Sequence, residues 1–129
     1  METNTRIIKN ISNDIIVDPR SINISMAIGD SATQKEIDLP RGKCFRVAAF
    51  FTGNDPVEPV NISVKDTGGI LIVRPTHYKD WKPGNAGYFE SMKAVNFNDR
   101  NPVIHVNSSI PLTTKLDVQI LFVVDVNDK

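Results

Sequence analysis

Residues that could carry out chemistry are few in this chain and lie far apart. It holds two histidines, His77 and His105, and one cysteine, Cys44, and these three do not share the close spacing of zinc ligands. Asp14 and Asp18 lie four residues apart, but no calcium loop with alternating oxygen ligands surrounds them. The nucleophile-elbow, phosphate-loop and dinucleotide fingerprints are missing from the sequence. We therefore expect no metal, no cofactor and no enzymatic activity.

Cys44 has two interpretations. Its neighbours Lys43 and Arg46 could lower the pKa of the thiol, which is the condition for a reactive cysteine. However, Cys44 also opens an apolar run, and a lone cysteine in a strand is typical of a small buried hydrophobe. We prefer the second interpretation. A single cysteine also excludes an internal disulfide.

Asp66-Thr67-Gly68 is the sharpest motif. Dimeric aspartic proteases of the retroviral kind carry Asp-Thr-Gly in chains of similar length, and two such carboxylates share a proton. The resemblance ends at those three residues, because Lys65 stands where an apolar strand should run into the aspartate. A hairpin loop over Asp66–Gly69 accounts for the same residues through turn propensity. We prefer the loop.

The segment 77–89 holds four of the nine aromatic residues, interleaved with lysine, aspartate and asparagine. We prefer the interpretation that Trp81 and Tyr88 anchor a long loop onto the domain. The alternative is a contact surface, because exposed aromatic rings beside polar groups bind proteins or stack on sugars. In that case a protein partner is favoured over a glycan, and the contact residues are Tyr78, Trp81, Lys82, Tyr88 and Phe89.

Short alternating strands are expected to position this segment. Apolar residues alternate with polar ones over 21–28, and turn residues separate that strand from a second one ending near Leu39, which predicts a hairpin. The run 44–51 is apolar on both faces and predicts a central strand. The segments 60–64 and 70–73 predict a second hairpin. Further strands are expected over 89–97 and 103–106, and 116–126 predicts a long central strand.

These elements predict one all-β domain spanning residues 1–129. Eight or nine short strands with turns between them, and no amphipathic helix, indicate an antiparallel two-sheet sandwich or jelly-roll-like barrel. The core is expected to rest on the segments 21–28, 44–51 and 116–126. The irregular segment 75–89 is where we expect function.

Charge and composition exclude several classes of partner. Fifteen basic residues balance fifteen acidic ones, so no strong field favours nucleic acid or an anionic membrane. The sequence has no run of about 18 apolar residues, which is the length needed to span a membrane. The first residues lack the pattern of a signal peptide, so we expect synthesis in a cytoplasm without secretion.

The run Trp81-Lys82-Pro83-Gly84-Asn85-Ala86-Gly87-Tyr88 and the stretch from Ile110 to Val126 resemble, in style, the small β-sandwich virion proteins of tailed bacteriophages. Such proteins include capsid auxiliary (decoration) proteins and fibre-attachment proteins. The resemblance implies a place in the virion, with capsid proteins, other virion proteins or identical subunits as partners. It assigns no residue a role.

Two functional hypotheses follow. The first is a non-enzymatic assembly protein that acts through protein–protein contacts. The second is a glycan-binding module in which Tyr78, Trp81 and Tyr88 form the stacking platform. A jelly-roll fold suits both, because fold does not determine function.

Overall fold

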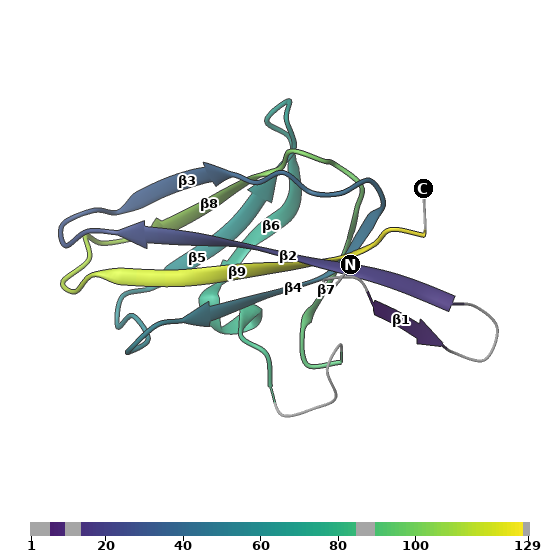
Figure 1. Ribbon diagram of the computed structural model, residues 1–129. Helices are drawn as coiled ribbons and strands as arrows, with labels where there is room; N and C mark the ends of the chain where they lie inside the picture. Colours follow the sequence, from purple (N-terminus) through teal and green to yellow (C-terminus); the bar gives the residue numbers. More distant parts are fainter. Residues whose placement is uncertain (1–5, 10–13, 85–89, 128–129) are drawn as a thin grey trace.

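The computed structural model describes residues 6–9, 14–84 and 90–127 (Figure 1). Along this part of the chain lie nine strands and one short 3-10 helix, η1. Their bounds are β1 (Arg6–Lys9), β2 (Asp14–Met26), β3 (Ala32–Glu36), β4 (Lys43–Phe51), β5 (Val60–Lys65), β6 (Leu71–His77), η1 (Tyr78–Trp81), β7 (Lys93–Phe97), β8 (Val103–Ser108) and β9 (Leu116–Asp125).

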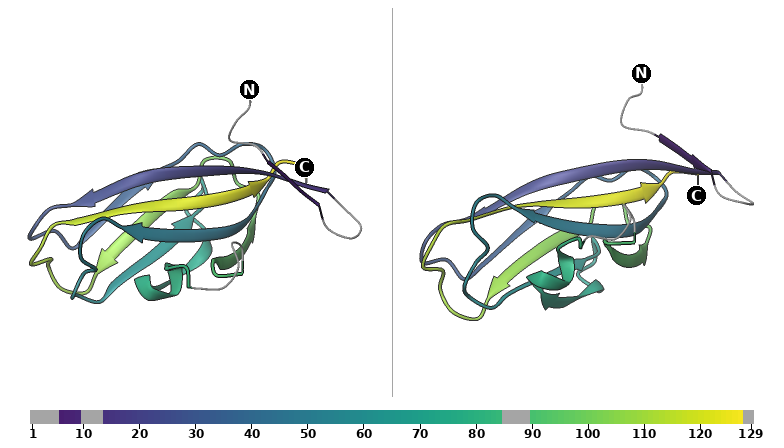
Figure 2. Two further views of the ribbon diagram at one scale, coloured as in Figure 1. Left: turned by 60° about the horizontal axis from the view of Figure 1, so that its bottom comes forward. Right: turned by 90° about the horizontal axis from the view of Figure 1, so that it is seen from below.

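The strands form two sheets. One has the order β1-β2-β9-β4-β7 and the other the order β3-β8-β5-β6, and all neighbouring strands are antiparallel. Figure 2 shows β2, β9 and β4 side by side in one layer, with the second layer and η1 beneath it. The expected all-β sandwich is therefore confirmed.

The pairing of the strands is nested. β2 pairs with β9, β3 with β8, β4 with β7, and β5 with β6. A chain folded once into a long hairpin pairs its strands in this order. Wrapping that hairpin around a core adds the contacts of β4 with β9 and of β5 with β8. This is the jelly-roll arrangement, and β1 extends it at one edge.

The main core lies between the sheets, and the two strands expected to be central provide much of it. β9 lies between β2 and β4, and β4 lies between β9 and β7. Val47 and Ala48 of β4 point to opposite faces, and both are completely buried. Val47 belongs to the main core, whereas Ala48 packs in a smaller cluster with Val17, Met92 and Val123. The prediction that 44–51 is buried on both faces is confirmed for the middle of the strand, whereas Phe50 near its end is 40% exposed.

β2 has one free edge beyond its short pairing with β1. The Ile16 carbonyl accepts a hydrogen bond from the Val126 N–H at 2.9 Å. Main-chain groups alternate along a strand, so the even-numbered residues turn theirs toward β9, as Ile16 does. The odd-numbered residues from Pro19 to Ser25 therefore turn theirs to the other edge. Pro19 has no N–H to offer there, and the Asn23 carbonyl accepts from the Lys35 ammonium at 2.9 Å. Proline and lysine at this edge oppose unwanted strand pairing.

One predicted hairpin is wrong. The strands near 21–28 and 36–39 were expected to pair, but β2 and β3 lie in different sheets. Ile37 and Leu39 are buried as expected, yet they follow β3, and their N–H groups donate to the carbonyls of Pro102 and Arg100. Alternation identifies the buried face of a strand but not its pairing partner, which here is set by the jelly-roll connections.

The other strand predictions fare better. The hairpin of β5 and β6, the strand β8 and the long C-terminal strand β9 are confirmed. The strand expected over 89–97 begins at Lys93, and Phe89 lies outside the described residues. No helix in the described ranges is long and apolar enough to cross a membrane.

Candidate functional site

The chain between β6 and β7 turns at one end of the sandwich, and η1 starts this turn. His77, the last residue of β6, caps η1, because its Nδ1 accepts a hydrogen bond from the Lys79 N–H at 3.2 Å. The Lys82 N–H then donates to the Lys79 carbonyl at 3.3 Å, which closes the helical turn. A 3-10 turn of this length is a common connector between longer elements.

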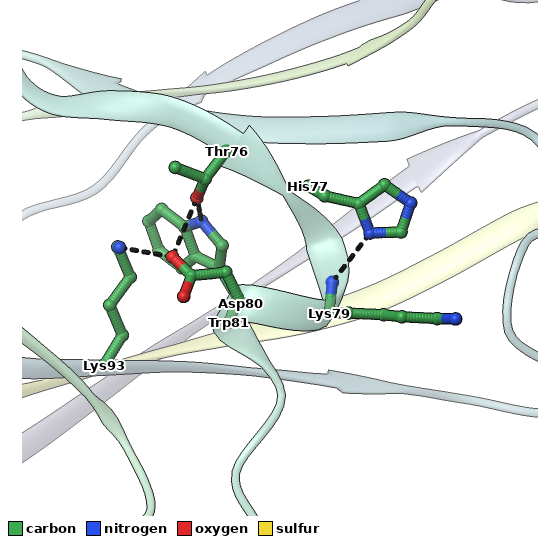
Figure 3. Close-up of polar contacts among 6 residues, drawn as sticks. All are labelled: Thr76, His77, Lys79, Asp80, Trp81 and Lys93. Carbon is green, nitrogen blue, oxygen red and sulfur yellow. Dashed lines mark hydrogen bonds and ion pairs between the residues drawn. The ribbon is translucent and has the colours of Figure 1, made fainter.

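A hydrogen-bonded chain fixes Trp81 (Figure 3). Its indole N–H donates to Thr76 Oγ1 at 3.0 Å, and the Thr76 hydroxyl donates to Asp80 Oδ2 at 3.0 Å. The Lys93 ammonium forms an ion pair with the same carboxylate oxygen. This contact with Lys93 holds the pKa of Asp80 below its ordinary value. Since Lys93 belongs to β7, the network connects the turn to the opposite sheet.

Tyr78 and Lys82 fasten the turn to the connection between β4 and β5. The Tyr78 hydroxyl donates to the Pro56 carbonyl at 3.0 Å, and its ring meets Phe51 edge-on with centroids 5.1 Å apart. Lys82 Nζ lies 2.5 Å from Asp55 Oδ2. Thus the segment is held by its own domain through contacts at several points.

The five predicted contact residues therefore have different outcomes. Tyr78 and Trp81 are buried, with 4% and 0% of their surface exposed, so neither ring offers a face to a partner. A stacking platform made from these two rings is not present, and Trp81 anchors the loop, as the preferred interpretation expected. Lys82 is exposed but ion-paired. Tyr88 and Phe89 lie outside the described residues.

Three other connections lie at the same end of the sandwich as η1: residues 27–31, 52–59 and 109–115. We call these three loops the apolar end. Each exposes one large apolar side chain, with Ile28, Val57 and Ile110 at 67%, 85% and 52% exposure. Ile28 was expected in the core row of its strand, but β2 ends at Met26, so the residue falls in the turn instead.

Main-chain hydrogen bonds hold the loops of the apolar end together. The Gly29 N–H donates to the Leu112 carbonyl at 2.8 Å, and the Leu112 N–H donates to the Asp30 carbonyl at 2.9 Å. The Ser109 N–H donates to the Pro59 carbonyl at 3.3 Å. Each exposed apolar residue lies within two positions of one of these contacts, so its backbone is held in place.

Glu58 adds a buried carboxylate beneath the apolar end. Its Oε2 accepts hydrogen bonds from the Thr113 N–H at 2.8 Å and from the Thr113 hydroxyl at 2.6 Å. These two donors hold the pKa of Glu58 below its ordinary value. Its other oxygen, Oε1, is buried and has no hydrogen-bond partner among the described residues. The carboxylate thereby joins the 52–59 loop to the 109–115 loop.

The candidate catalytic residues do not come together. Cys44 is buried, and desolvation raises the pKa of its thiol to about 12, which confirms the interpretation as a buried hydrophobe. Burial and the nearby Lys65 lower the pKa of His105. Asp66 Oδ1 accepts from the Ile70 N–H at 2.8 Å, so this aspartate stabilises its own turn. No three His, Cys, Asp or Glu side chains in the described ranges are grouped so as to hold a metal.

The strongest surface feature, the apolar end, was missed from the sequence. A signal was present: Ile28, Val57 and Ile110 each lie next to, or one residue away from, a glycine or proline in a turn cluster. Apolar residues in such connections are exposed because loops run over the surface. No known family model matches the chain, and no curated protein is similar enough to count as a relative.

Proposed function

We propose that this protein is a non-enzymatic assembly component of a tailed-bacteriophage virion, and that the apolar end is its contact surface. The candidate classes are capsid auxiliary (decoration) proteins and head-fibre or tail attachment proteins. The partners are capsid proteins, other virion proteins or identical subunits.

The observation that carries the proposal is the exposure of Ile28, Val57 and Ile110 on three connected loops. A single exposed apolar residue is ordinary, but several gathered at one end mark an interaction site. The core of a protein–protein interface is apolar and depleted in charge. Because the loops are already fixed, little conformational freedom would be lost on binding.

The fold supports the proposal as an analogy. Jelly rolls occur in viral capsid proteins and in lectins, so the topology is compatible with assembly without assigning it. The glycan-binding hypothesis based on segment 77–89 loses two of its three rings, because Tyr78 and Trp81 are buried.

The test compares two sets of substitutions. Ile28→Ser, Val57→Ser and Ile110→Ser together should abolish self-association, or co-sedimentation with virion particles, as measured by light scattering after size exclusion and by centrifugation. Ile70→Ser with Leu71→Ser, which alters exposed apolar residues away from this end, is the matched control and should retain assembly. An unchanged mass and unchanged sedimentation in the triple variant would contradict the assigned surface.

Genomic context tests the virion assignment separately. The proposal expects genes for a portal protein and a major capsid protein beside this gene. A wild-type chain that stays monomeric and sediments with no virion particle would contradict the assembly role itself.

A further inference from the structure

The outer face of the five-stranded sheet carries a pocket of about 280 Å³. It is lined by Asn23, Ile24, Ser25, Thr52, Asp117 and Val118. Ile24 and Val118 are buried in the main core and are register partners. Because side chains alternate along a strand, Asn23, Ser25 and Asp117 project from the opposite, outer face.

Polar groups on this face lie in two rows. Ser25 is the register partner of Asp117, and the Thr52 N–H donates to the Asp117 carbonyl at 3.0 Å, so these three residues form one row across the strands. In the adjacent row, Gln119 lies between Asn23 and Phe50. Partners in neighbouring strands lie roughly 5 Å apart. The pocket thus gathers an amide, two hydroxyls and a carboxylate over a short span.

The Asp117 carboxylate is already oriented. Its Oδ1 accepts from the Ser25 hydroxyl at 2.5 Å, and its Oδ2 lies 3.8 Å from Lys115 Nζ. A carboxylate has about four acceptor positions, so it can still accept hydrogen bonds from a ligand. The neighbouring lysine offsets its charge, and a neutral ligand therefore suits the pocket better than a cation.

Phe50 supplies an apolar surface beside these polar groups. Its side chain is 40% exposed, and as the register partner of Gln119 it projects from the outer face, next to the residues that line the pocket but not one of them. Adjacent hydroxyl, amide and carboxylate groups bind the hydroxyls of a sugar, and an aromatic ring packs against the apolar face of the sugar ring.

We propose that this pocket binds a neutral saccharide, with Asp117 and Asn23 binding sugar hydroxyls and Phe50 packing against the ring. The site differs from segment 77–89 in position and in residues. It does not rest on the assembly role, and a virion component that binds glycans would use both surfaces.

The experiment is a titration of the full chain with a panel of neutral monosaccharides and short oligosaccharides, followed by the backbone amide signals in NMR spectra. A binding sugar should saturably shift the signals of Asn23, Ser25, Thr52 and Asp117. Asp117→Asn and Phe50→Ala should each weaken binding by about tenfold or more. Glu36→Gln and Leu71→Ala, exposed residues of the other sheet, are matched controls and should bind as the wild type does.

Two results would overturn the proposal. In the first, no sugar of the panel shifts the pocket signals of the folded wild-type chain. In the second, Asp117→Asn and Phe50→Ala bind with unchanged affinity. The pocket borders the apolar end, because Thr52 belongs to the 52–59 loop. The two proposals are separated by their measurements, since the triple variant is followed by mass and sedimentation and Asp117→Asn is expected to assemble normally.

Discussion

The two ends of the sandwich are built in the same way but present different surfaces. The connections 37–42, 66–70 and 98–102, which we call the polar end, are also joined by hydrogen bonds. The Thr67 hydroxyl donates to Asp99 at 3.2 Å, and the Asn101 amide donates to Asp38 at 3.3 Å. There, side-chain carboxylates join the loops in addition to the main-chain bonds from Ile37 and Leu39 to the 98–102 loop, and Ile70 is the large apolar residue exposed among the described positions of these loops.

Between the three loops of the apolar end, most contacts are made by main-chain groups, and Glu58, whose carboxylate joins two of these loops, is buried. The side chains at the loop tips are therefore left free to be apolar. Leaving such side chains in water forgoes roughly 25 cal/mol for each Å² that could be buried. Hydrogen bonds therefore join the loops at both ends. All three loops of the apolar end expose a large apolar side chain, whereas among the described positions of the polar-end loops only Ile70 does.

Removing Trp81 should have the largest effect, because this residue anchors the η1 turn that borders the apolar end. Trp81→Ala empties a fully buried site and should lower the free energy of unfolding by about 3–5 kcal/mol. Urea denaturation followed by circular dichroism measures this, since Trp81 is the sole tryptophan and fluorescence is lost with it. Trp81→Phe keeps most of the volume and should cost less. A loss below about 0.5 kcal/mol in the alanine variant, typical of a surface site, would show that the turn is not an anchor.

Two glycines, one at each end, test the difference between the ends at the level of the backbone. Gly42 at the polar end has φ +143°, and an added Cβ would lie 2.4 Å from the Asp125 carbonyl oxygen. Gly29 at the apolar end has φ +92° with no atom within 4 Å of an added Cβ. Gly42→Ala should therefore lower the free energy of unfolding by about 2–4 kcal/mol, and Gly29→Ala by about 1–2 kcal/mol. Thermal or urea unfolding measures both, and equal losses would contradict the close packing at Gly42.

The alternation of apolar residues explains why most of the strands could be predicted. The central strands β4 and β9 follow from their apolar runs, because only a strand buried on both faces needs apolar residues at successive positions. The pairing of β2 with β9 joins residues about 90–110 positions apart, and no local pattern encodes it. This is why the first hairpin was wrongly predicted while the β5–β6 hairpin, with its short loop, was confirmed.

The candidate site was harder to predict, because exposure is a property of the folded chain. Trp81 and Val57 illustrate the problem: the tryptophan lies in a polar, irregular segment yet is buried, whereas the valine is 85% exposed. Trp81 is buried because Thr76 accepts its indole N–H and so satisfies its polar group. The pocket residues were missed for another reason, since Ser25, Thr52 and Asp117 meet only through strand pairing.

The smallest expected effect is on the pH dependence of stability. It tests the contribution of Glu58, the buried carboxylate of the apolar end, separately from that of the main-chain contacts. The hydrogen bonds from Thr113 lower the pKa of Glu58 in the folded chain below its ordinary value of 4.5. A lowered pKa means that the ionised form is favoured by folding. The contribution of the ionised Glu58 carboxylate to the free energy of unfolding is therefore complete above about pH 4.5. It is lost as the pH falls through the pKa that Glu58 has in the folded chain.

Glu58→Gln should remove this contribution. The difference in the free energy of unfolding between wild type and variant, measured by urea denaturation from neutral to acidic pH, should shrink as the pH falls below 4.5. Thr113→Val removes the hydroxyl donor and should reduce the same pH-dependent part. A difference that stays constant with pH would mean that Glu58 does not join the two loops as a carboxylate, which would leave the main-chain bond from Ser109 to Pro59 as the contact between them.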